Sequence, residues 1–216
     1  MELTRDGYVA TLRGVEDDSF EATAAILASL TDAYECRAVV LPLAGEGSGS
    51  PLNGEQTAWF EHYPIPLIAA ITGDTSGAAA TYALASDIRV AARDSTLRVA
   101  AIGSRRILRL LGEAGSVAVM EGGGRLSGEA ALEAGLVSAV VDDPLAEAQR
   151  IGDVIASRGP IATRFAKEAM WRGLGMPLSE GLRMETDLTI LLQSTKDRAE
   201  GVAAFVEKRP PTFKGE

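Results

Sequence analysis

The stretch from Pro66 to Asp94 constrains the fold most, because extended apolar segments alternate there with a turn and a small-residue helix. An apolar run, Pro66–Thr72, ends abruptly in a glycine-flanked turn at 73–77. Small residues then dominate 78–85, which predicts a helix, and 87–92 returns to extended chain. A strand that enters a helix through glycines leaves unpaired backbone N–H groups at the helix start. Such groups suit an oxyanion or a phosphate.

Strand-like and helix-like segments alternate through the first two thirds of the chain, and after Pro144 every segment has helical periodicity. This order predicts an α/β fold with a mostly parallel sheet. We expect an α/β core over residues 1–143 that holds the ligand pocket, and a helical region over 144–216 for oligomerisation and ligand contact. Further predictions are strands at 8–13, 38–43 and 136–141, and helix N-caps at Ser127, Ser179 and Asp197.

Composition excludes several classes of function. A net charge of −9 argues against a nucleic-acid surface, because phosphate backbones require a basic face. The sequence contains no run of 18 apolar residues and no hydrophobic leader, so we expect no membrane partner and a cytoplasmic location. The single cysteine, Cys36, cannot form an internal disulfide, and its neighbours lack metal-ligand spacing, so we predict a structural thiol and no metal site.

Five motifs in a fixed order resemble the crotonase superfamily, the enoyl-CoA hydratase/isomerase family. Each motif is common alone, and their order from Pro66 to the end of the chain carries the resemblance. The matching segments are 66–70 with Gly73, 86–91, 125–137, 166–169 and 197–211. The first third of the chain matches only by pattern.

The resemblance implies a spiral of ββα units with a helical C-terminal region that forms a homotrimer or hexamer. It also implies an acyl-CoA thioester as ligand, with coenzyme A entering as part of the substrate and no permanently bound cofactor. Two backbone N–H groups, near Ser50 and near Ala79, would hold the thioester carbonyl as an oxyanion hole. One such donor contributes roughly 3–4 kcal/mol to an enolate-like transition state. Lys208 corresponds to the residue near the CoA phosphates.

The chain departs from the family at the two glutamates that hydratases use as acid and base. Their places are occupied by Thr81 and Ala101. A threonine hydroxyl is not a base near neutral pH without a neighbour that takes its proton, and alanine cannot titrate. Asp74, next to the glycine-flanked turn, is the best remaining titratable candidate; its other interpretation is a turn-stabilising aspartate that bonds its own backbone. Two functions stay open: lyase or isomerase chemistry on the thioester enolate, and a catalytically silent acyl-CoA-binding homologue.

A third hypothesis is a serine hydrolase on the same fold. Ser50 or Ser76 would be its nucleophile, and His62, the only histidine, its base. No motif supports that triad. A cluster of three arginines within residues 105–109 has two interpretations: attraction of the CoA phosphates, or a helix face paired with local carboxylates.

Overall fold

A computed structural model describes residues 1–99 and 104–216 of the chain, and a six-stranded sheet forms the centre of this part. All neighbouring strands are parallel except the edge pair β1 and β2, which is antiparallel. In sheet order the strands are β1 (Glu2–Asp6), β2 (Val9–Arg13), β3 (Ala38–Ala44), β4 (Leu67–Thr72), β6 (Ile88–Ala92) and β9 (Ala139–Val141).

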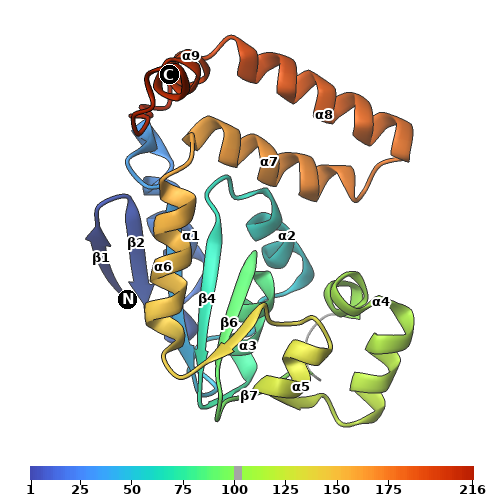
Figure 1. The fold of residues 1–216 in the computed structure, drawn as a ribbon. Helices are drawn as coiled ribbons and strands as arrows, with labels where there is room; N and C mark the ends of the chain where they lie inside the picture. Colours follow the sequence, from blue (N-terminus) through green and yellow to red (C-terminus); the bar gives the residue numbers. More distant parts are fainter. Residues whose placement is uncertain (100–103) are drawn as a thin grey trace.

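The central strands are buried on both faces, which explains their continuous apolar sequences. In β3, Val39 and Leu41 belong to one apolar cluster, and Ala38 and Val40 belong to another on the opposite face. Helix α6 (Pro144–Ala156) covers the second face, as Figure 1 shows. The first cluster also holds side chains from several helices, among them α1 (Phe20–Ser29), α2 (Gly54–His62) and α3 (Gly77–Ala85).

Two successive ββα units continue from this sheet. In each unit a strand of the large sheet is followed by a strand of a second, three-stranded sheet and then by a helix. The units are β4, β5 (Asp74–Thr75) and α3, then β6, β7 (Thr96–Arg98) and α4 (Ser104–Glu121). The smaller sheet is completed by β8 (Arg125–Ser127), which leads into α5 (Gly128–Glu133). Helix α4 contains a break at Gly112, where φ is 68°.

The last three helices lie at one end of the sheet (Figure 1). They are α7 (Pro160–Gly173), α8 (Leu178–Gln193) and α9 (Lys196–Glu207), and α7 packs along α8. Helix α8 has no buried residue within one chain. We expected the helical region to begin at residue 144, which is the first residue of α6. Helix α6 packs against the strands of the large sheet, so by its contacts it belongs with the sheet. Two short 3₁₀ helices, η1 (Val15–Asp17) and η2 (Asp32–Tyr34), complete the described elements.

Of the N-caps predicted at Ser127, Ser179 and Asp197, the structure confirms only Ser127. The Ser127 hydroxyl accepts the Ala130 amide at 3.2 Å and begins α5 as predicted. Ser179 lies inside the first turn of α8, because that helix already begins at Leu178. The N-cap of α9 is Thr195, and the predicted cap Asp197 instead accepts the amides of residues 214 and 215 of the C-terminal tail at 2.7 and 2.9 Å.

The strand predicted at 136–141 is shorter than expected. Only Ala139–Val141 pairs with β6, and Leu136 and Val137 are buried in the turn that follows α5. A positive φ of 77° at Gly135 turns the chain there. Among the described residues, no helix is both long enough and apolar enough to cross a bilayer.

Candidate active site

The two turns that the sequence singled out lie against each other. The loop after β3 and the turn before α3 are joined by a backbone bond from the Ser76 amide to the Gly45 carbonyl, at 2.8 Å. Further along the same loop, the Leu52 amide donates to the Thr81 hydroxyl at 3.1 Å. The parallel pairing of β3 with β4 explains this meeting, because both loops leave the same edge of the sheet.

The start of α3 presents backbone amides that the helix itself cannot satisfy. The first intrahelical bond runs from Ala80 to the Ser76 carbonyl, and the Ser76 side chain does not cap the helix. The Ala79 amide donates to the Glu46 carbonyl at 3.3 Å, so this predicted donor is already paired. Among the described residues, the Gly77 and Ala78 amides have no hydrogen-bond partner. The structure therefore favours Ala78 over Ala79 as the free donor.

The other predicted donor, Ser50, lies in the exposed part of the β3–α2 loop, and its amide has no partner among the described residues. The loop is fixed just before it, where the Gly49 amide donates to the Glu16 carbonyl at 2.8 Å. A Cβ at Gly49 would lie 2.8 Å from that carbonyl, and one at Gly47 would collide with it. Glycine is needed at both positions for this close approach of two backbones.

Two glutamates beside this loop were not predicted as site residues. The side chain of Glu46 lies against the start of α3, where a Cβ on Gly77 would be 2.7 Å from its Cγ. Glu16 is nine-tenths buried, and burial raises the pKa of its carboxyl group. Its Oε2 has no partner among the described residues. The sequence feature that could have identified Glu46 as a site residue is a lone carboxylate between two loop glycines at the end of a strand.

Thr81 serves as a link between the two turns. Its side chain is buried, and its hydroxyl donates to the Ala78 carbonyl at 2.7 Å while it accepts the Leu52 amide. Both roles of the hydroxyl are used, so Thr81 has no proton available for a substrate. The second glutamate position, Ala101, lies outside the described residues.

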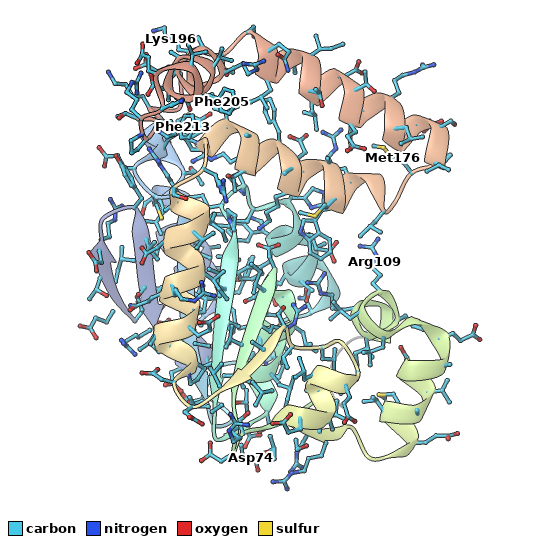
Figure 2. All side chains as sticks on the ribbon, in the orientation of Figure 1. Asp74, Arg109, Met176, Lys196, Phe205 and Phe213 are labelled. Carbon is cyan, nitrogen blue, oxygen red and sulfur yellow. The ribbon has the colours of Figure 1, made fainter. Side chains whose placement is uncertain are left out.

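Asp74 is committed to the smaller sheet. Its carboxylate accepts the Thr96 hydroxyl at 2.6 Å and the Arg125 guanidinium at 3.3 Å. The hydrogen bond from Thr96 holds the pKa of Asp74 below its usual value. Figure 2 shows Asp74 at the lower end of the molecule, well separated from Arg109. These contacts join β5, β7 and β8, which is a structural role.

Lys208 and His62 do not reach the two turns within one chain. Lys208 ends α9, which Figure 1 shows at the opposite end of the molecule from the start of α3. His62 is exposed at the end of α2, and its Nδ1 lies 2.8 Å from the carbonyl of Ala58 in the same helix. In the described part of the chain, no hydrogen bond joins His62 to Ser50 or Ser76.

The arginine cluster is partly structural. Arg106 is buried, donates to the Leu84 carbonyl at 2.7 Å and stacks on the Trp171 ring at 4.3 Å. Arg106 and Arg109 share one carboxylate, that of Glu61, at 3.2 and 3.0 Å. Pairing with a local carboxylate therefore accounts for Arg106. Arg109 is paired with the same carboxylate, but its guanidinium stays partly exposed.

The sequence profile of enoyl-CoA hydratase/isomerase matches residues 17–216. The chain belongs to the enoyl-CoA hydratase/isomerase family. A crystal structure of an enoyl-CoA hydratase from Bacillus anthracis superposes with a TM-score of 0.86 at 30% identity, and covers 100% of this chain and 99% of that one. The fold is thus the crotonase fold, as the resemblance implied. Members of the family act on CoA thioesters without a permanent cofactor.

Curated relatives carry hydratase names. A putative enoyl-CoA hydratase/isomerase of Bacillus subtilis is 36% identical over 73% of this chain and 65% of its own length. The (E)-benzylidenesuccinyl-CoA hydratase of Thauera aromatica is 32% identical over 97% of this chain and 82% of its own length. A rat mitochondrial methylglutaconyl-CoA hydratase is 37% identical, over 71% of this chain and 53% of its own length. Several alignments thus span only half to two thirds of the relative.

Proposed function

We propose that this family member binds an acyl-CoA thioester and holds its carbonyl oxygen between the amides of Ser50 and Ala78. The proposal rests on one observation: the bond between Leu52 and Thr81 brings two unpaired backbone donors into neighbouring turns. Donors fixed in this way stabilise the oxyanion of a thioester enolate without further reorganisation. Such stabilisation supports lyase or isomerase chemistry at the α-carbon.

A proton must still move to or from the α-carbon, and Thr81 cannot carry it. We assign this role to Glu46, whose side chain lies over Gly77 and whose carbonyl holds the Ala79 amide. One chain segment would then position both the helix start and the base. The proposal includes no second carboxylate that would activate water. We therefore do not expect efficient hydration of the double bond of an enoyl-CoA.

A second candidate function is a catalytically silent acyl-CoA-binding protein. The commitment of both the Thr81 hydroxyl and the Asp74 carboxylate to structural bonds favours it. The two functions share the binding step and differ only in proton transfer at the α-carbon.

Calorimetric titration with butyryl-CoA, followed by NMR of its α-protons in D₂O, separates these functions. The proposal predicts saturable binding and enzyme-dependent loss of the α-proton signal. Binding without exchange would leave only the silent function. No heat at millimolar ligand would overturn both. A parallel absorbance assay with crotonyl-CoA tests hydration, which we expect to be weak.

We also propose that the chain assembles as a homotrimer or hexamer through α8 and α9. Helix α8 buries no residue within one chain, and Leu178 and Phe205 are 80% and 84% exposed. Apolar side chains at this exposure are typical of a surface covered by a partner. In such an assembly Lys208 of a neighbouring copy would supply the contact with the CoA phosphates. Sedimentation equilibrium should give three or six times the chain mass, and a monomer would contradict this assembly.

A further inference from the structure

A cavity of about 460 Å³ lies between α2, α4 and the end of α7. Residues 52–54, at the end of the loop that carries Ser50, form part of its wall. Figure 2 shows Arg109 of α4 directed toward the chain around Met176, on the opposite wall. The volume falls in the usual range for pockets that bind small organic groups.

The wall of this cavity carries more positive than negative side chains, although the chain as a whole carries −9. Its wall contains three guanidinium groups, from Arg106, Arg109 and Arg172, and one carboxylate, from Glu61. Arg106 is occupied by backbone carbonyls and by Glu61. Arg109 uses one nitrogen for Glu61, so other N–H donors of its guanidinium remain to bind a second carboxylate.

The remaining wall is largely apolar, with Leu52, Ala58, Trp171 and Met176 among its residues. Leu52 connects this wall to the predicted oxyanion hole, because its amide is bonded to Thr81 while its side chain lines the cavity. The Leu84 carbonyl, which holds Arg106, is six residues beyond Ala78 in the same helix, an axial rise of about 9 Å. Arg109 shares the Glu61 carboxylate with Arg106, so it belongs to the same end of this span as Arg106. A short acyl chain that begins at Ala78 and follows the cavity would end near Arg109.

We propose that the natural acyl group ends in a carboxylate, so that the ligand is the CoA thioester of a short dicarboxylic acid. This inference rests on the proposed function, which supplies the thioester end of the ligand. The apolar wall packs against the methylene groups, and Arg109 binds the terminal carboxylate. Arg172, which is already paired with Glu168, adds a guanidinium to the same wall. Bidentate pairing of guanidinium with carboxylate makes arginine suited to this selection.

The test compares adipyl-CoA with hexanoyl-CoA by calorimetric titration. The two thioesters have acyl chains of equal length and differ in a terminal carboxylate against a methyl group. We expect adipyl-CoA to bind about tenfold more tightly or better, the fold-change that one charge-assisted hydrogen bond supplies. Arg109→Gln should remove most of this preference and leave the affinity for hexanoyl-CoA unchanged. Arg172→Gln should reduce the preference in the same direction.

The matched control is Arg150→Gln on α6, which also loses one exposed ion pair but lies on the other face of the sheet. It should leave both affinities unchanged, and circular dichroism checks that each variant is folded. Equal affinities of the two thioesters would overturn the inference. Weakening of both thioesters by Arg109→Gln would also overturn it, because that result assigns the arginine to the CoA phosphates. Failure of both thioesters to bind would overturn the proposed function itself, and the inference with it.

Discussion

The Leu52 amide donates to the Thr81 hydroxyl at 3.1 Å, and this single bond ties the β3–α2 loop to helix α3. Thr81 therefore holds the two predicted donor turns together. The resemblance places a catalytic glutamate at this position, whereas the contacts of Thr81 are those of a positioning residue.

Replacing Thr81 by valine keeps the shape of the side chain and removes the hydroxyl. The Leu52 amide would lose its partner, so we expect a loss of about 1–3 kcal/mol in unfolding free energy, measured by urea denaturation. Affinity for butyryl-CoA should also fall, because the Ser50 loop is no longer anchored. Thr81→Ser, which retains the hydroxyl, should bind as the natural chain does. A valine variant with unchanged stability and affinity would show that the link is dispensable.

Glu46→Gln removes the proposed base but not the backbone carbonyl that holds Ala79. We expect α-proton exchange in butyryl-CoA to fall by about 10²-fold or more, since a positioned base typically supplies 10²–10⁴. Binding should stay within a few fold. Glu55→Gln, in the exposed first turn of α2, is the control and should exchange normally. If exchange survives Glu46→Gln intact, another group moves the proton.

A buried ion pair attaches α7 to the sheet. Lys167 donates to Asp87 at 2.6 Å, and Asp87 also accepts the Trp171 indole N–H and the Leu67 amide. Burial lowers the pKa of Lys167, but its partner keeps the charged pair in place. Lys167→Met leaves Asp87 buried without its counter-charge and should cost about 3–5 kcal/mol in urea denaturation. The double variant Lys167→Met with Asp87→Asn should recover part of this loss. If Lys167→Met costs less unfolding free energy than Arg150→Gln, the pair of Lys167 and Asp87 does not attach α7 to the sheet.

Glu16 should make stability depend on pH. Its pKa in the folded chain is raised above the ordinary 4.5, so the folded state holds the proton more tightly than the unfolded state. Stability therefore falls as pH rises from 4.5 through the raised pKa. Glu16→Gln removes this penalty, and we expect it to be more stable than the natural chain at pH 7 and nearly equal near pH 4. Glu113→Gln, exposed on α4, should show no such difference; equal pH profiles for natural chain and Glu16→Gln would refute the account.

Local patterns predicted much of the fold. The apolar run before Gly73 and the alanines after it predicted the strand β4, the turn and the helix α3 of one ββα unit. Ser127 caps α5, as its place in the sequence predicted. These features depend on neighbours in sequence. The predicted cap at Ser179 was wrong because α8 begins one residue earlier, at Leu178. The predicted cap at Asp197 was wrong because its carboxylate accepts amides of the C-terminal tail.

The site was predicted less well, for a physical reason. Whether a backbone amide is free depends on a partner far away in sequence, as the Glu46 carbonyl on Ala79 shows. The cavity arginines could be read equally well as a surface cluster, because their shared partner Glu61 belongs to a different helix. No local pattern reports such pairings.

The central claim is that two backbone amides polarise a thioester carbonyl. Isotope-edited infrared spectroscopy of bound butyryl-CoA, labelled with ¹³C at the carbonyl, measures this polarisation directly. We predict a shift of the C=O stretch to lower frequency on binding. The shift should shrink when the Ala78 N–H is replaced by an ester oxygen, and persist when Ala79 is replaced in the same way. A thioester that binds but keeps its solution frequency would contradict the account.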